Sequence, residues 1–145
     1  MIAVDGSQES MAAADYAISL ATVEKHRSEL ILLHVIPSEV KFGHSSGILG
    51  VVPPKLRKHK EQEAYKWFDK IKAKTNNIKG IIAISTKVIS TGASPQVEIV
   101  EYAIKANIDL IVLGTRGMSG PRKLLLGSVA LGVIMNSHCP VLVVK

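Results

Sequence analysis

The strongest constraint on the fold of this chain is a regular alternation of short aliphatic runs with longer stretches of helical periodicity. Most of the aliphatic runs are nearly continuous, without the polar alternation of a half-exposed strand, which is typical of parallel strands covered on both faces. We therefore predict strands at each run. The runs occupy residues 2–4, 30–36, 81–89, 110–113 and 141–144.

Helical signals separate these runs. Apolar residues recur at three- and four-residue intervals over residues 9–25 and 55–74. Ser94 followed by Pro95 predicts the start of a third helix, and residues 128–136 a fourth. The strand–helix order within 145 residues predicts one domain over residues 1–145 with right-handed crossovers. This order specifies an α/β fold, a three-layer sandwich around a five-stranded parallel sheet.

The net charge of +6 is concentrated in one predicted helix, since residues 55–74 hold eight basic and three acidic side chains. The same segment carries an apolar stripe, so we interpret its lysines as a solvated helix face, and a nucleic-acid partner is not expected. The predicted buried stripe consists of Leu56, Ala64, Trp67, Phe68, Ile71 and Ile78.

Residues 37–54 form an unusually long, glycine-rich connection without helical or strand periodicity. We expect a loop or lid beside the site, with the alternative that its apolar part, residues 48–52, packs on a neighbouring subunit.

Several classes of protein are excluded or disfavoured by composition. No apolar run approaches the 18 or more residues of a membrane span, and Cys139 is the only cysteine, so no internal disulfide can form. We therefore expect a cytoplasmic protein without membrane association. His44 and His59 have no partner at metal-ligand spacing, and His34 is interpreted as a core histidine, so no metal site is expected.

The chemistry is expected where parallel strands end, because open α/β sheets bind ligands at their carboxyl edge. Asp5 follows the first strand, and Gly114, Arg116 and Gly117 follow the fourth, shortly before a helix that opens at Ser128. Glycines allow close backbone approach, and a helix N-terminus attracts anions. The sequence has no P-loop and no G-x-G-x-x-G after the first strand. Three structural alternatives remain open: Asp5 as an Asx-turn residue, Gly114 and Gly117 as residues that only turn the chain, and Ser128 as an N-cap.

The spacing G-x2-G-x9-G-S, which begins at Gly114 and ends at Ser128, resembles the nucleotide motif of the universal stress protein family. The resemblance spans the whole chain. Its other segments are V-D-G-S at 4–7, L-H-V at 33–35, D-L-I-V-L-G-T-R-G at 109–117, L-L-L-G-S-V at 124–129 and H-C-P-V-L-V-V at 138–144.

This resemblance implies a Rossmann-like, adenine nucleotide alpha hydrolase-like fold with sheet order 3-2-1-4-5. It also implies ATP, ADP or AMP as ligand, with Mg²⁺ accompanying ATP, and a homodimer through the edge strand Val141–Val144. By this resemblance, Asp5 would bond the ribose and the Val35 backbone would meet the edge of adenine. Gly114 and Arg116 would line the ribose and the α-phosphate. The phosphates would be bound by Gly117, Gly127, Ser128 and Val129. Ala130 departs from the family, which often has a hydroxyl there.

The predicted function is a stress-response sensor or signalling protein that binds adenine nucleotide with little turnover. No catalytic residue is expected, because residues 118–126 include no Asp, Glu or His that could position water near a γ-phosphate. Two alternatives stay open: a slow Mg²⁺-dependent ATPase or phosphotransfer enzyme, and an interaction module in which nucleotide orders residues 37–54 for a protein partner of unknown identity.

Overall fold

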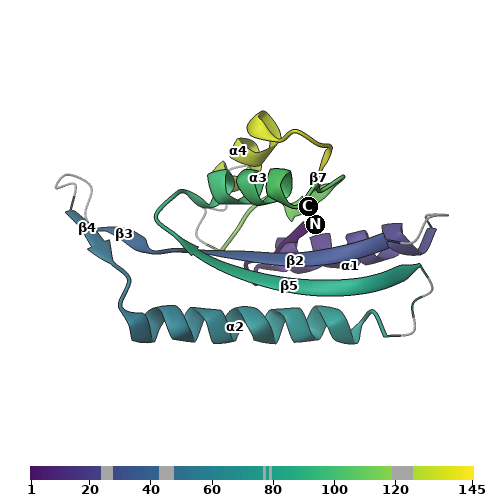
Figure 1. Ribbon diagram of the computed structural model, residues 1–145, viewed down its shortest axis with the longest axis horizontal. Helices are drawn as coiled ribbons and strands as arrows, with labels where there is room; N and C mark the ends of the chain where they lie inside the picture. The colour runs from purple at the N-terminus through teal and green to yellow at the C-terminus, as the bar shows by residue number, and fades with distance from the viewer. Residues whose placement is uncertain (24–27, 43–47, 77, 79, 119–125) are drawn as a thin grey trace.

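The computed structural model describes residues 1–23, 28–42, 48–76, 78, 80–118 and 126–145. Its helices and strands follow the predicted alternation (Figure 1). They are β1 (Ile2–Ala3), α1 (Gln8–Val23), β2 (Ser28–Pro37), β3 (Glu39–Phe42), β4 (Ile48–Val51), α2 (Pro54–Ala73), β5 (Ile81–Thr91), α3 (Pro95–Lys105), β6 (Ile111–Gly114), α4 (Ser128–Asn136) and β7 (Val141–Val144).

The main sheet has five strands in the order β5-β2-β1-β6-β7, and its neighbouring strands pair in parallel. Numbered along the chain within this sheet, the order is 3-2-1-4-5, which confirms the predicted topology. The strand order reverses at β1, so the carboxyl ends of β2, β1 and β6 lie side by side at the point where such folds bind ligands.

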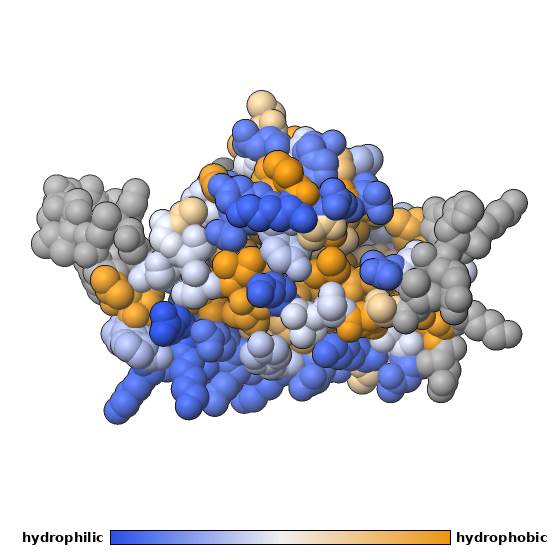
Figure 2. All heavy atoms as spheres, in the orientation of Figure 1, coloured by the Kyte–Doolittle hydropathy of each residue, from blue (hydrophilic) through white to orange (hydrophobic). Residues whose placement is uncertain are grey.

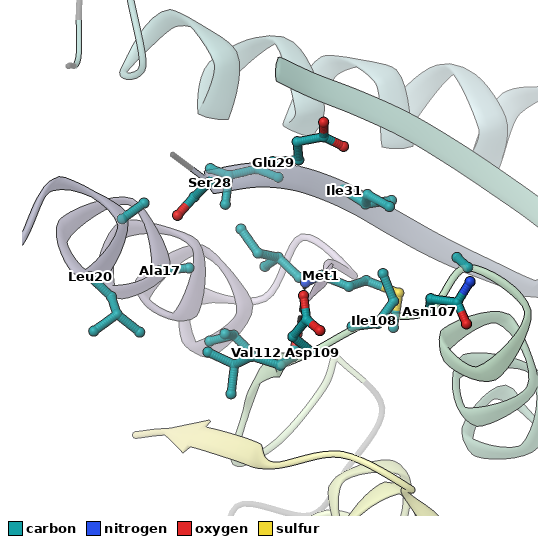
Figure 3. Close-up of a pocket in the computed structure, with 15 residues that line it drawn as sticks. Met1, Ala17, Leu20, Ser28, Glu29, Ile31, Asn107, Ile108, Asp109 and Val112 are labelled. Atoms are coloured by element: carbon teal, nitrogen blue, oxygen red, sulfur yellow. Dashed lines mark hydrogen bonds between the residues drawn. The ribbon is translucent and has the colours of Figure 1, made fainter. Parts of the chain in front are cut away.

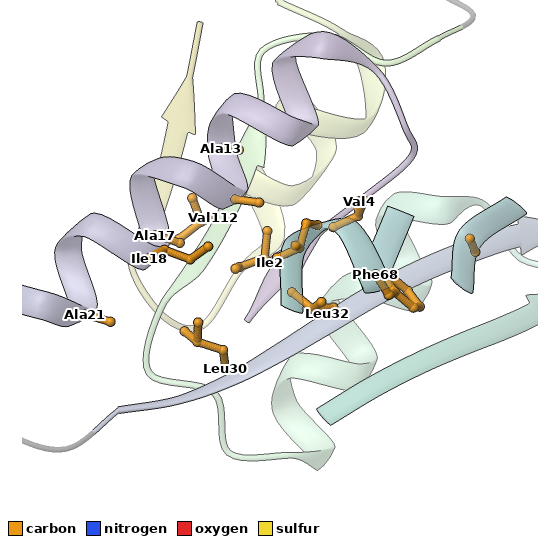
Figure 4. Packing of buried hydrophobic residues seen from close by; sticks show 13 residues of the cluster. Ile2, Val4, Ala13, Ala17, Ile18, Ala21, Leu30, Leu32, Phe68 and Val112 are labelled. Atoms are coloured by element: carbon orange, nitrogen blue, oxygen red, sulfur yellow. The ribbon is translucent and has the colours of Figure 1, made fainter. Parts of the chain in front are cut away.

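Two apolar clusters hold the layers together, one on each face of the sheet. Leu32 belongs to the cluster under α1 and α2, whereas its neighbour Leu33 belongs to the cluster under α3 and α4, as the two-residue period of a strand requires. Figure 4 shows Ala17 and Ile18 of α1 and Phe68 of α2 gathered around the sheet residues of the first cluster.

The basic helix α2 packs as predicted along most of its length. Ala64, Phe68 and Ile71 are buried, and Trp67 is partly buried against the same cluster. Leu56 is 44% exposed, contrary to the prediction, because residues 53–59, the N-cap and about the first two turns of α2, are all exposed and precede the packed part of the helix. Figure 2 shows hydrophilic residues gathered along α2, consistent with a solvated face.

The connection between β2 and α2 differs from the predicted loop. Strands β3 and β4 pair antiparallel within it, and Val52 N–H donates to the Ser38 carbonyl at 2.8 Å at the base of this hairpin. Residues 39–42 alternate polar and apolar side chains, so the expectation that residues 37–54 have no strand periodicity is wrong there. Residues 43–47, where the lid interpretation also falls, lie outside the described residues.

Among the helices that the structure describes, none combines the length and the apolar character that crossing a membrane requires.

Candidate functional site

Asp5 lies at the exit of β1 and connects two segments that are far apart in the sequence. Its Oδ1 accepts hydrogen bonds from the Ser7 N–H at 3.0 Å and from the Ser7 hydroxyl. Its Oδ2 accepts the Met118 N–H at 3.0 Å. The Asx-turn interpretation therefore holds for the geometry, while the same carboxylate also reaches the segment that follows β6.

The first turn of α1 is capped locally. The Ser7 Oγ accepts the Ser10 N–H at 3.1 Å, and the Ser10 Oγ in turn accepts the Asp5 N–H at 3.3 Å. This arrangement satisfies N–H groups that a helix start leaves without intrahelical partners, and it fixes the backbone that carries Asp5.

Two glycines after β6 allow close packing around Asp5. A Cβ on Gly114 would lie 2.7 Å from the carbonyl carbon of Glu9 and 2.9 Å from the Ser10 nitrogen, so a side chain there would collide with the α1 backbone. A Cβ on Gly117 would overlap Oδ2 of Asp5. The first two glycines of the motif are therefore required, because the α1 backbone and the Asp5 carboxylate lie too close to them for a side chain to fit.

The start of α4 presents backbone N–H donors. Gly127 is the N-cap residue and Ser128 is the first helical residue, so the interpretation of Ser128 as N-cap is wrong, and among the described residues no side chain caps this helix. The Gly127 N–H donates to the Thr115 carbonyl at 2.7 Å, which places the helix start beside the end of β6. The following first-turn N–H groups have no intrahelical acceptor and lie at the positive end of the helix dipole.

Arg116 is oriented by an ion pair within the same region. Its Nη2 lies 3.0 Å from Oε1 of Glu9, and each side chain is about one-quarter exposed (26% and 24%). The structure thus draws the guanidinium toward the first turn of α1 while keeping Arg116 at the cavity wall.

These segments enclose a cavity of about 510 Å³ at the carboxyl ends of β2, β1 and β6. Every site residue predicted from the sequence lies on its wall. They are Asp5, Val35, Gly114, Arg116, Gly117, Gly127, Ser128 and Val129, and Ala130 lies beside them.

One wall of this cavity comes from α2 and was not predicted from the sequence. Lys60, Glu63 and Trp67 line it, and their i, i+3, i+7 spacing places them on one helix face. That spacing is visible in the sequence, but the predicted apolar stripe assigned Trp67 to the core. Pro95 and Ile99 of α3 also line the cavity.

His34 joins this wall from β2. Its Nδ1 lies 2.7 Å from the Val4 carbonyl, which can only accept, so Nδ1 carries the proton and Nε2 is the acceptor in the neutral ring. Burial is the main cause that lowers the pKa of His34, which favours this neutral form. The ring meets Trp67 edge-on, with centroids 5.2 Å apart. His34 is therefore hydrogen-bonded like a core histidine, yet it lines the cavity.

A second cavity, of about 580 Å³, lies at the opposite edge of the sheet, where α1 and α3 end (Figure 3). Glu29 and Asp109 are among its lining residues. Helix C-termini and carboxylates both repel anions, and the Met1 ammonium that also lines this cavity already donates to the Leu110 carbonyl at 2.7 Å. A phosphate is therefore less favoured here than in the carboxyl-edge cavity.

Within the described residues, no three His, Cys, Asp or Glu side chains are grouped so that they could hold a metal ion. His59 Nε2 lies 3.7 Å from Glu63 Oε1, and His44 falls outside the described residues.

The fold and the carboxyl-edge cavity define a doubly wound α/β protein with an anion-attracting helix start at its switch point. The family model for the universal stress protein family matches residues 1–145. A universal stress protein of Methanocaldococcus jannaschii is 37% identical over 145 residues, which cover 100% of this chain and 80% of that protein. Universal stress protein YxiE of Bacillus subtilis is 34% identical over 149 residues, which cover 100% of this chain and 97% of that protein. The chain therefore belongs to the universal stress protein family.

Solved structures agree with the fold. The universal stress protein UspA from Lactobacillus plantarum superposes with a TM-score of 0.77 at 24% identity, covering 99% of this chain and 94% of that one. A universal stress protein in complex with cAMP superposes with a TM-score of 0.68 at 24% identity, covering 99% of this chain and 94% of that one. A universal stress protein from Archaeoglobus fulgidus in complex with dAMP superposes with a TM-score of 0.65 at 21% identity, covering 100% of both chains.

Proposed function

We propose that this chain is a cytoplasmic stress-response sensor or signalling protein that binds an adenine nucleotide in the carboxyl-edge cavity. The observation that carries the proposal is the start of α4, which no side chain among the described residues caps and which lines the same cavity as Asp5 and the end of β2. Solved members of the family in complex with cAMP and with dAMP support the same ligand class.

The phosphates are assigned to the start of α4. The N–H groups of Ser128 and Val129 follow the cap residue Gly127, and a phosphate there would meet both backbone donors and the positive helix end. Arg116 adds a cation at the cavity wall. Ala130 offers no hydroxyl, so we expect AMP and ADP to bind nearly as well as ATP.

The ribose is assigned to Asp5, whose carboxylate can accept hydrogen bonds from sugar hydroxyls. Asp5 already accepts the Met118 N–H, and Gly117 leaves the space beside Oδ2 that this approach requires. The sugar would therefore lie between the exit of β1 and the segment after β6.

The adenine is assigned to the backbone of Val35. β1 pairs with β2 only as far as Ala3 opposite Leu33, and the Leu33 carbonyl accepts the Val4 N–H. Since backbone groups two residues apart point to the same side of a strand, the N–H and C=O of Val35 point beyond the end of β1. A donor and an acceptor in that position match the edge of adenine.

We propose binding without efficient turnover. Residues 118–126 include no Asp, Glu or His, and hydrolysis needs a group that orients water together with metal ligands. Mg²⁺ bound with ATP would then be held mainly by phosphate oxygens and water.

The binding proposal is tested by thermal unfolding with AMP, ADP and ATP. A ligand that binds only the folded state adds about 2.7 kcal/mol of stability at 100 times its Kd, so each nucleotide should raise the Tm and GTP should do so less. No Tm shift with millimolar adenine nucleotide contradicts the proposal.

The phosphate assignment is tested by a matched pair of variants at the helix start. A Cβ on Gly127 would lie 3.3 Å from the Thr115 carbonyl oxygen, so Gly127→Ala fits with a small adjustment, whereas Gly127→Val adds two methyl groups near the donors. We expect the AMP affinity of Gly127→Val to fall more than tenfold, which is a loss of more than about 1.4 kcal/mol in binding free energy. The affinity of Gly127→Ala should fall far less. Normal folding with parental affinity in Gly127→Val would place the phosphates elsewhere.

We also propose a homodimer built on β7. This strand, Val141–Val144, is an edge of the sheet and entirely aliphatic, whereas the other edge, β5, carries the exposed Lys87. An aliphatic edge without a charge invites pairing with a second chain. Light scattering should give about twice the 15.6 kDa chain mass, and Val143→Lys should give the monomer mass. A monomeric parent, or a dimer unchanged by Val143→Lys, contradicts this proposal.

A further inference from the structure

The wall that α2 contributes to the cavity contains the only tryptophan of the chain. Trp67 is partly buried, whereas Tyr65 on the same helix is 50% exposed and does not line the cavity. A large aromatic side chain at a cavity wall offers an apolar surface that a flat ring can cover.

The position of Trp67 is fixed by two of the three strands that end at the cavity, β1 and β2. Gly6 has a φ of +83°, and a Cβ on it would overlap the six-membered ring of the indole, so the absence of a side chain lets Trp67 lie against the exit of β1. On the β2 side the indole meets the His34 ring at an interplanar angle of 85°.

The same contacts place Trp67 close to the backbone assigned to the base. His34 precedes Val35 in β2 and touches the indole, and all three residues line the cavity. The indole therefore lies one side chain away from the N–H and C=O of Val35, which point beyond the end of β1.

We infer that Trp67 is the binding residue that packs against the base of the nucleotide, so that α2 supplies affinity for the base while the Val35 backbone selects adenine. This inference rests on the proposed function. Stacking on an aromatic ring depends little on which base is present, so Trp67 should contribute to any purine nucleotide. The backbone of Val35 should account for the preference between adenine and guanine.

The first test uses the unaltered protein and the intrinsic fluorescence of its single tryptophan. AMP should change the Trp67 emission saturably, with the same Kd that calorimetry gives. Ribose 5-phosphate, which lacks the base, should leave the emission unchanged at concentrations where it binds.

The second test compares Trp67→Leu, Trp67→Phe and the control Tyr65→Leu, which removes an aromatic ring from the same helix outside the cavity. Trp67→Leu should weaken AMP and GMP by a similar factor, roughly five- to a hundredfold. Its affinity for ribose 5-phosphate should match the parent. Trp67→Phe should lose less, and Tyr65→Leu should bind like the parent.

The outcomes separate this inference from the proposed function. If calorimetry shows AMP binding but the Trp67 emission does not change and Trp67→Leu binds AMP as the parent does, the inference is overturned and the proposed function stands. Equal losses for AMP and ribose 5-phosphate in a folded Trp67→Leu also overturn it, because they indicate a general structural role. If the parent binds no adenine nucleotide, both fall. Should Trp67→Leu not fold, the emission of the parent and the affinity of Trp67→Phe decide.

Discussion

Replacing Gly117 with alanine should disturb Asp5 without changing Asp5 itself. The backbone of Gly117 needs no left-handed conformation, so alanine is tolerated locally, but its Cβ would overlap Oδ2 of Asp5. The carboxylate has to move by about 1 Å to restore a normal contact. That movement breaks or weakens the 3.0 Å hydrogen bond that Oδ2 accepts from the Met118 N–H.

The two expected consequences differ in size. The lost hydrogen bond is largely solvent-exposed, so the free energy of unfolding should fall by only about 1 kcal/mol. Nucleotide binding should fall more, because a displaced Asp5 would lose the charged hydrogen bond that we propose it makes to the ribose. Such a bond contributes about 1.5–3 kcal/mol, which raises the Kd of AMP roughly 10- to 150-fold.

A double-mutant cycle measures whether Gly117 acts through Asp5. Calorimetric titration with AMP is carried out on the parent, Gly117→Ala, Asp5→Asn and the double variant, with urea unfolding of each as the control for folding. If the displaced carboxylate explains the loss, the double variant should bind about as weakly as Asp5→Asn alone. Additive losses within about 0.3–0.5 kcal/mol, or parental affinity in Gly117→Ala, would refute the reasoning.

Three further predictions concern stability and pH. Gly114→Ala should lower the free energy of unfolding by about 1–3 kcal/mol in urea, because its Cβ meets the Glu9 carbonyl carbon at 2.7 Å; an unchanged urea midpoint would contradict the close approach of α1. Phe68→Ala should lower the free energy of unfolding by about 3–5 kcal/mol, because Phe68 is fully buried at 0% exposure. A Tm close to that of the parent would contradict this prediction. Burial lowers the pKa of His34 from 6.5, so the unfolded chain binds a proton more readily. Stability should therefore fall as pH decreases through about 6.5 and level off below the folded-state pKa. Urea unfolding at about pH 7.5 and 5.5 should show a smaller difference in His34→Gln, and an equal difference would assign the effect to other groups.

The sequence by itself determined the order of the main-sheet strands and helices. The near-continuous apolar runs indicate strands covered on both faces, and the crossover rules leave few ways to connect them in parallel. Helix α4 and strand β7 were predicted with the bounds that the structure shows, because Gly127 and Pro140 mark their edges locally. Asp5, Gly114 and Gly117 were found because they follow predicted strand ends, and Ser128 because it begins a predicted helix, whereas Val35 was implied only by the family resemblance. All of these residues line the carboxyl-edge cavity.

Only the tertiary structure decided which segments face one another across that cavity. Asp5 and Met118 are separated by 113 positions, and the ion pair of Arg116 with Glu9 likewise depends on the strand order that brings β1 beside β6. A helical period shows which side of α2 is apolar, but not that Trp67 contacts His34 and lines the cavity. Local sequence patterns show which face of a helix or strand a residue occupies. Which residue it contacts on that face depends on how distant elements pack together, and a single sequence does not show this packing.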